Sequence, residues 1–191
     1  MTLQRVAVFA GESELASPEE VVAARRVGDC LAGAGITMIC SGDALGLIGV
    51  AIEAAVRAGG QVVGVAPDDQ PDHRIHPALS ELRRVRDRQQ QRAELTAADA
   101  YIALPDAFAT FDQVLAVLAG GERREIPIGL VDEGGAYSAL LERAGDQTLD
   151  RFVRESQRGL IVMTTDVADL VNRLRDYGPP ETRRRHAGSS D

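Results

Sequence analysis

The sequence predicts an α/β fold with a doubly wound, mostly parallel sheet flanked by helices. Two observations lead to this prediction. Short β-rich runs alternate with helical segments along most of the chain, a pattern typical of parallel strands joined by right-handed crossovers. The strand runs are also almost continuously apolar, as expected for strands covered on both faces. We therefore expect one Rossmann-like domain over residues 1–177.

Six runs are strand candidates and six segments are helix candidates. The expected strands are residues 5–10, 36–40, 61–66, 99–104, 126–132 and 160–165. The expected helices are residues 19–35, 46–60, 88–98, 110–121, 136–145 and 166–177. Local signals mark some helix ends: Ser17 and Pro18 precede two acids at the first helix, an arrangement that caps its start and suits the helix dipole.

Two segments depart from this alternation. Residues 67–87 are long, charged and punctuated by prolines, and in an α/β domain such a loop lies over a site or is mobile. Residues 178–191 are polar and rich in helix breakers, which predicts a disordered tail.

Composition excludes several function classes. Apolar residues make up 45% of the 191 residues, aromatics only 4%, so the core must consist of Val, Leu, Ile and Ala. The net charge of −8 disfavours nucleic-acid binding, because an acidic surface repels phosphate backbones. No apolar run reaches membrane-spanning length, and the N-terminus resembles a first strand rather than a signal peptide. Cys30 and Cys40 lack the spacing of a disulfide framework or metal site. We expect a cytoplasmic protein without a cofactor.

Ligands of doubly wound sheets bind at the carboxyl ends of the strands. Three such ends carry suggestive residues, namely 10-AGESE-14, 41-SGDALGLIG-49 and 104-LPDAFATFDQV-114. Glycines at positions 11, 42, 46 and 49 would allow the backbone to approach a ligand closely. The favoured alternative is that they form tight turns and allow helices to pack on the sheet.

The order of these segments resembles the LONELY GUY (LOG) family of phosphoribohydrolases, long mislabelled as lysine decarboxylases. The resemblance extends from about residue 6 to about residue 176. It rests on 8-VFAGES-13, 41-SGDALGLIG-49, 59-GGQVVGVAP-67, 99-DAYIALP-105 and 125-EIPIGLVD-132, which follow the family's pattern of strand ends and turns. The resemblance implies a LOG-like α/β fold and a dimer whose helices pack between subunits.

The family's P-G-G-x-G-T-x-x-E signature aligns without gaps on residues 105–113, and here the sequence departs from it. Pro105 and Thr110 match, but Asp106, Ala107 and Ala109 replace the three glycines, and Gln113 replaces the catalytic Glu.

Other positions of the family pattern are also substituted. Without a gap, the family's Arg-Lys pair falls on Gln90 and Gln91, and a shift of one residue would bring in Arg92. In the second turn Ser41 and Asp43 replace glycines, and in the first turn Glu12 replaces a serine.

The resemblance implies an enzyme that splits a base from a nucleoside 5′-monophosphate, with the phosphate on the glycine loop and a helix N-terminus. Each element is weakened here. Asp106 and Asp43 would place negative charge near the incoming dianion, and Ala107 and Ala109 add Cβ atoms where the backbone should approach. Gln113 is neutral and cannot accept a proton at neutral pH, a loss that typically costs on the order of 100- to 10,000-fold in rate.

Two aspartates have alternative interpretations. Asp112 could substitute for the missing Glu, but on a helix it points about 100° away from position 113 and has a shorter side chain. Asp106 is better interpreted as the N-cap of the helix that starts near Phe108.

The long segment contains further candidates. His73 and His76, with Asp72 beside them, could begin a metal site, but two ligands on a loop are weak evidence, and we assign no metal. The run 83-RRVRDR-88 could receive an anionic ligand, although an exposed strand or helix start is the favoured interpretation. Arg88 is a binding candidate because it precedes Gln90 and Gln91.

Three hypotheses follow. The first is a LOG-like domain, impaired or inactive as an enzyme, that acts by binding a nucleotide-like small molecule or a protein. The second is a working N-glycosidase with a rearranged site. The third is a structural subunit of a LOG-like assembly. In the first, the ligand-binding candidates are Gly11, Glu12, Ser41, Gly42, Asp43, Arg88, Gln90, Gln91, Asp106, Ala107, Ala109 and Thr110.

Overall fold

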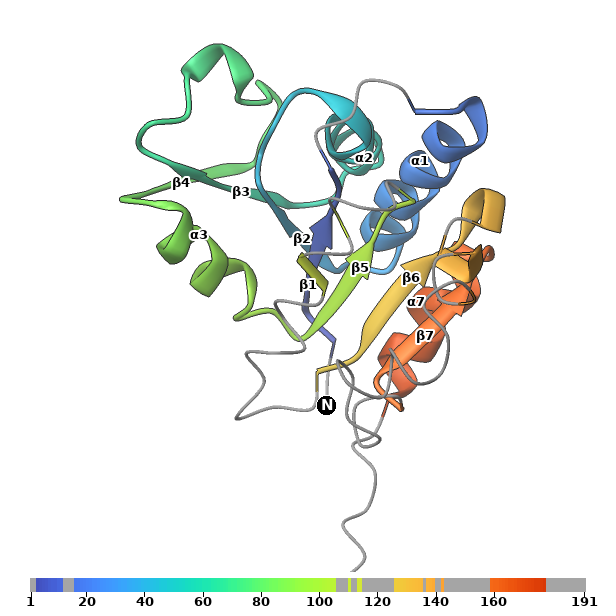
Figure 1. Cartoon of the computed structure of the whole chain (residues 1–191). Coiled ribbons are helices and arrows are strands. Elements are labelled where there is room, and N and C mark those ends of the chain that lie inside the picture. Colours follow the sequence, from blue (N-terminus) through green and yellow to red (C-terminus); the bar gives the residue numbers. More distant parts are fainter. Residues whose placement is uncertain are drawn as a thin grey trace, which may run out of the picture.

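A computed structural model of the chain describes residues 3–11, 16–105, 110, 113–114, 126–135, 137–139, 142 and 159–177. Its centre is a seven-stranded sheet in the order β4-β3-β2-β1-β5-β6-β7 (Figure 1). Every neighbouring pair of strands is parallel. The predicted doubly wound α/β fold is therefore confirmed.

All six expected strands are present. The strands are β1 (Arg5–Phe9), β2 (Thr37–Cys40), β3 (Val62–Pro67), β4 (Glu81–Val85), β5 (Ala100–Ala103), β6 (Ile128–Val131) and β7 (Ile161–Thr164). The seventh strand, β4, lies inside the segment 67–87 that was expected to be a loop. It is an edge strand in which only Val85 is buried, so its sequence lacks the apolar run that revealed the inner strands. The favoured interpretation of the 83–88 run, an exposed strand or helix start, is confirmed, because the run contains the end of β4 and the first residue of α3.

Helices cover both faces of the sheet (Figure 1). The helices are α1 (Pro18–Gly33), α2 (Gly46–Arg57), α3 (Arg88–Leu95) and α7 (Val167–Asp176), with a short turn of 3-10 helix, η1, at Asp72–Arg74. Helices α1, α2 and α7 lie on one face, and α3 lies on the other. Most of the expected helices 110–121 and 136–145, together with the tail 178–191, lie outside the described residues.

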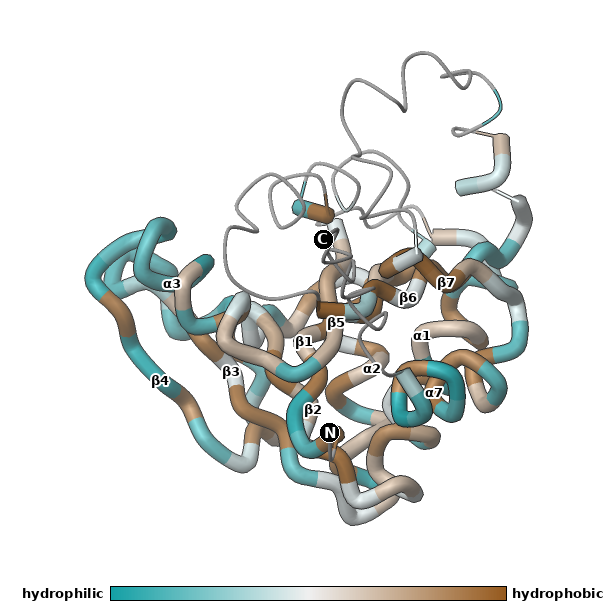
Figure 2. The backbone as a smooth tube through the Cα atoms, turned by 90° about the horizontal axis from the view of Figure 1, so that it is seen from below, coloured by the Kyte–Doolittle hydropathy of each residue, from teal (hydrophilic) through white to brown (hydrophobic). Residues whose placement is uncertain are grey.

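Two apolar clusters fill the space between the sheet and these helices. The larger one joins β1, β2 and β5 to α1, α2 and α7 through side chains such as Val6, Leu31 and Ile52. The smaller one lies on the α3 face and includes Leu95, Tyr101 and Tyr137. Figure 2 shows the contrast in hydropathy between the brown inner strands and the more hydrophilic edge at β4 and α3. Aliphatic residues dominate both clusters, as the composition predicted.

Helix α1 shows how local sequence fixes an element. The Ser17 hydroxyl accepts a hydrogen bond from the Glu20 amide at 3.2 Å, and the Glu20 carboxylate accepts one from the Ser17 amide at 2.7 Å. This reciprocal capping box satisfies amides that the first helical turn leaves unpaired.

The strand order determines where a ligand can bind. From β1 the chain winds outward through β2, β3 and β4, and it then returns to the other side of β1 to form β5. Such a reversal opens a crevice beyond the carboxyl ends of the two adjacent strands, here β1 and β5. None of the helices in the described parts of the chain is long and apolar enough to cross a membrane.

Candidate functional site

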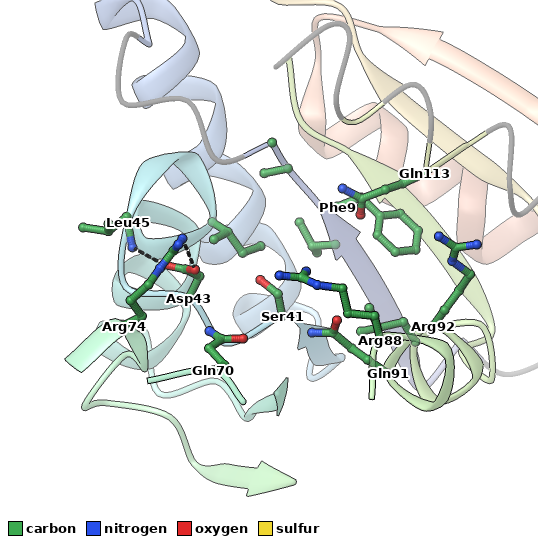
Figure 3. A pocket seen from close by; sticks show the side chains of 15 residues that line it. Phe9, Ser41, Asp43, Leu45, Gln70, Arg74, Arg88, Gln91, Arg92 and Gln113 are labelled. Carbon is green, nitrogen blue, oxygen red and sulfur yellow. Dashed lines mark hydrogen bonds and ion pairs between the residues drawn. The ribbon is translucent and has the colours of Figure 1, made fainter. Parts of the chain in front are cut away.

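A pocket of about 440 Å³ lies at this crevice (Figure 3). Residues from the ends of β1 and β2, from helix α3 and from the segment after β5 line it. The lining consists of Val8, Phe9, Ala10, Gly11, Ser41, Asp43, Leu45, Ile48, Gln70, Arg74, Arg88, Gln91, Arg92, Leu95 and Gln113. Six of the predicted site residues meet here: Gly11, Ser41, Asp43, Arg88, Gln91 and Gln113.

One wall of the pocket is the turn between β2 and α2, together with Arg74; we call it the β2–α2 wall. The Asp43 carboxylate accepts a hydrogen bond from the Leu45 amide at 3.0 Å and forms an ion pair with Arg74 at 2.6 Å. The Asp43 side chain is only 10% exposed and that of Arg74 30% exposed. The negative charge that Asp43 was expected to present to a phosphate is therefore balanced by a guanidinium.

Arg74 reaches this wall from residues 68–80, which we call the strap. The Ala44 amide donates to the Arg74 carbonyl at 2.7 Å, and the His76 amide donates to the Gly42 carbonyl at 2.9 Å. Near the start of the strap, Arg84 on β4 donates to the carbonyls of Pro67 and Gln70 and pairs with Asp72. The long charged segment is thus fastened at both ends beside the site.

The strap contributes Gln70 and Arg74 to the pocket, and the sequence reasoning missed both. The length and proline content of the segment indicated a loop over a site, but not which side chains would enter it.

Gly42 contributes to the turn rather than to the lining. Its φ is +73°, and a Cβ placed there would lie 3.1 Å from the Cα of Gly64 on β3. Gly42 therefore allows a left-handed turn and a close approach between strands, which agrees with the structural alternative for this glycine.

The opposite wall is one face of α3, formed by Arg88, Gln91, Arg92 and Leu95; we call it the α3 wall. Gln91 is buried and donates to the Val65 carbonyl at 2.6 Å, which fastens the helix to β3. Gln90 lies outside the lining, and its side-chain oxygen accepts from the Arg86 amide at 3.1 Å. Arg92 lines the pocket while Gln90 does not, which favours the alignment shifted by one residue.

Arg88 and Arg92 are one turn apart on α3. Figure 3 shows Arg88 pointing toward Ser41 and Arg92 at the end of the pocket near Phe9 and Gln113. Neither guanidinium forms an ion pair with a carboxylate of the described residues. Asp43 is the one acid among the described lining residues and is paired with Arg74, so this part of the pocket carries a net charge of two positive units.

Three residues of the 105–113 signature are described: Gln113 lines the pocket, whereas Pro105 and Thr110 are buried outside the lining. Thr110 is fully buried, and its hydroxyl has no hydrogen-bond partner among the described residues. Gln113 is half-buried and lines the pocket. The other candidates near these strand ends, Glu12, Asp106, Ala107, Ala109 and Asp112, lie outside the described residues.

The remaining titratable candidates have structural surroundings. The Nδ1 atom of His76 accepts a hydrogen bond from the Ala78 amide at 3.2 Å, and burial lowers the pKa of this imidazole. Burial raises the pKa of the Cys40 thiol to about 12, so Cys40 stays protonated at neutral pH. Within the described ranges, no group of three or more His, Cys, Asp or Glu side chains could hold a metal ion.

Comparison with known proteins identifies the family. The model of the family described as "Possible lysine decarboxylase" matches residues 48–174. The probable cytokinin riboside 5′-monophosphate phosphoribohydrolase LOGL5 of Oryza sativa subsp. japonica is 34% identical over 181 residues, covering 93% of this chain and 74% of that protein. The chain belongs to the LONELY GUY (LOG) family. The cytokinin riboside 5′-monophosphate phosphoribohydrolase LOG3 of Arabidopsis thaliana is 29% identical over 180 residues, covering 92% of this chain and 84% of that protein.

Solved structures share the fold of this LOG-family chain. The molybdenum cofactor binding protein of Rippkaea orientalis superposes with a TM-score of 0.71 at 15% identity, covering 92% of this chain and 98% of that one. The molybdenum cofactor carrier protein of Chlamydomonas reinhardtii gives a TM-score of 0.67 at 19% identity, with coverages of 91% and 99%. At these identities the likeness shows the fold alone.

Proposed function

We propose that this LOG-family protein binds a nucleoside 5′-monophosphate or a close analogue in the pocket but hydrolyses its N-glycosidic bond poorly. One observation carries the proposal: Gln113, at the position of the family's catalytic Glu, lines the pocket, while the one described acid of the lining, Asp43, is paired with Arg74. The described part of the site therefore offers cations for an anionic ligand and no free carboxylate for catalysis.

The shape and polarity of the pocket support the binding half of the proposal. A volume of about 440 Å³ lies in the range of small-molecule sites. Apolar side chains such as Phe9, Ile48 and Leu95 line it beside the arginines, a combination that suits a planar base joined to an anionic group. The relatives named above are phosphoribohydrolases of a riboside 5′-monophosphate.

The chemistry of Gln113 supports the proposal that hydrolysis is slow. Cleavage of an N-glycosidic bond develops positive charge on the ribose and needs an activated water. A carboxylate can accept a proton and stabilise that charge, whereas the amide of Gln113 does neither at neutral pH. Loss of a positioned general base costs on the order of 100- to 10,000-fold in rate.

The test combines binding with turnover. The purified protein is titrated calorimetrically with AMP and N6-modified AMP, and free base is measured by chromatography after incubation. We expect saturable binding and base release on the order of 100-fold or more slower than for an intact LOG enzyme assayed in parallel. Exchange of Asp106, Ala107 and Ala109 for Gly together with Gln113→Glu is expected to raise base release.

Two results would contradict the proposal in different ways. Base release at the rate of the intact enzyme, abolished by Thr110→Ala or Asp112→Asn, would indicate a working N-glycosidase with a rearranged site. Absence of calorimetric binding and of thermal stabilisation by every nucleotide would favour a structural subunit.

The assembly and location are part of the same proposal. We propose a cytoplasmic homodimer that binds no nucleic acid, on the basis of the family resemblance and the net charge of −8. Analytical ultracentrifugation tests the dimer, and a monomer at micromolar concentration would contradict it.

A further inference from the structure

We propose that Arg88 and Arg92 on α3, rather than the backbone of the 105–110 segment, anchor the phosphate of the ligand. This assignment rests on the proposed function and specifies which residues hold the anionic group. It predicts a ligand that carries a phosphate monoester dianion, because two guanidinium groups that pair with no carboxylate of the described residues line the pocket.

The turn between β2 and α2 is already occupied. The start of a helix attracts anions through its unpaired amides and its dipole, and α2 begins beside the pocket at Gly46. Here the Asp43 carboxylate accepts from the Leu45 amide at 3.0 Å and pairs with Arg74 at 2.6 Å. An internal carboxylate thus occupies the Leu45 amide, and its ion pair with Arg74 leaves this turn without net positive charge to attract a second anion.

The 105–110 segment has lost the residues that would favour phosphate. Ala107 and Ala109 stand where the family has glycines, and Asp106 adds a negative charge. The residue types of this segment therefore disfavour phosphate binding.

The α3 wall provides what these two segments lack. Arg88 and Arg92 share one helical face, since residues four apart lie one above the other, and both line the pocket. Arg88 is the first residue of α3, where a cation is unfavourable because of the helix dipole. Its position is explained if an anion binds against it. Guanidinium groups also form paired, charge-assisted hydrogen bonds with phosphate oxygens.

The helix that carries these arginines is firmly placed. The Asp87 side chain caps α3 by accepting from the Gln90 amide at 2.8 Å, and Gln91 ties the helix to β3. The backbone of both arginines is therefore held in place, and phosphate binding has to restrict only the rotations of their side chains.

The experiment compares AMP with adenosine in calorimetric titrations of the wild-type protein, Arg88→Met and Arg92→Met. Each variant is expected to lose about 10- to 100-fold in affinity for AMP, as when a charge-assisted hydrogen bond is removed. Adenosine lacks the phosphate, so its affinity should change less than about threefold. Arg88→Lys should retain part of the AMP affinity because it keeps the charge.

Arg83→Met is the matched control. It removes the same charge from β4, where Arg83 pairs with Glu81 and, at 3.7 Å, with Glu94, all three outside the lining, and AMP affinity should stay unchanged. Ribose 5-phosphate and inorganic phosphate serve as further probes, to separate recognition of the phosphate from recognition of the base. Unfolding midpoints verify that every variant is folded.

The outcomes separate this inference from the proposed function. If AMP binds and neither arginine variant weakens it, or if AMP and adenosine are weakened equally, the phosphate assignment is overturned while nucleotide binding stands. If the wild-type protein binds neither AMP nor adenosine nor the phosphate probes, the proposed function is overturned, and the assignment with it.

Discussion

The two walls of the pocket both carry charged side chains, but they use them differently. On the β2–α2 wall the Asp43 carboxylate and the Arg74 guanidinium neutralise each other and hold the strap in place. On the α3 wall Arg88 and Arg92 have no acidic partner among the described residues. The difference teaches that a charged side chain in a pocket can either stabilise the fold or bind a ligand. Its partners within the protein indicate which role it has.

Removal of the paired charge should have the largest effect on stability. We expect Asp43→Ala to lower the free energy of unfolding by about 2 to 3 kcal/mol, because it breaks a partly buried ion pair and removes the acceptor of the Leu45 amide. This value is below the range for fully buried pairs, since solvent screens the 30% exposed Arg74 side chain. Urea denaturation measures the change.

Asp29→Ala is the control for this change. Asp29 pairs with Arg57 at 3.8 Å on the surface, where both side chains are about half exposed, so the loss should stay below about 0.5 kcal/mol. Equal losses of unfolding free energy in Asp43→Ala and Asp29→Ala would show that the Asp43–Arg74 pair stabilises the protein no more than an ordinary surface ion pair.

The α3 wall depends on its attachment to the sheet. We expect Gln91→Ala to lower the free energy of unfolding by about 1 to 2 kcal/mol, because it leaves the buried Val65 carbonyl without its donor. AMP affinity should fall as well, since the arginines lose their fixed base. Gln90→Ala, one residue earlier and outside the lining, should change both quantities less. If Gln91→Ala changed neither the free energy of unfolding nor the AMP affinity, the hydrogen bond to the Val65 carbonyl would be dispensable.

Acidification should weaken the attachment of the strap through His76. The pKa of His76 lies below its ordinary value of 6.5 because of burial, so the unfolded chain binds this proton more readily than the folded one. Its contribution to stability is therefore complete above pH 6.5 and is lost as the pH falls through the folded-state pKa. Protonation also removes the Nδ1 acceptor of the Ala78 amide.

Denaturation curves at several pH values, compared between the wild-type protein and His76→Gln, measure this contribution. The difference in the free energy of unfolding between the wild-type protein and His76→Gln should be smaller at acidic pH than at neutral pH. A difference that does not vary with pH would argue against any role of His76 protonation in holding the strap.

Removal of Arg88 or Arg92, which have no acidic partner among the described residues, should have the smallest effect on stability. Arg88→Ala and Arg92→Ala should each change the free energy of unfolding by less than about 0.5 kcal/mol, because substitutions of exposed side chains away from structural contacts have small effects. Arg88→Ala should stabilise the protein slightly, since it removes a cation from a helix N-terminus. A loss above 1 kcal/mol would show that these arginines serve the fold.

The inner strands could be predicted from the sequence because burial on both faces requires continuous apolar runs, as in residues 61–66. Strand β4 was not assigned to the sheet, since an edge strand with only Val85 buried carries no such pattern. Only the alternating 83–88 run indicated an exposed strand or helix start there. The strand ends that line the pocket were also predictable, because parallel strands end at one edge of the sheet. The entry of Gln70 and Arg74 depends on contacts with residues far away in sequence, and no local pattern records these.

The sequence by itself determined the alternation of strands and helices, the LOG-like order of motifs and the substitutions at Gln113 and Asp43, because these follow from residue identity and short-range spacing. Only the tertiary structure decided which charges are paired. Asp43 and Arg74 are 31 positions apart and meet because the strap folds back onto the β2–α2 turn. Arg88 and Arg92 remain available because α3 directs them into the pocket, away from the described carboxylates. Charge pairing depends on distance in space, which the linear order of residues does not contain.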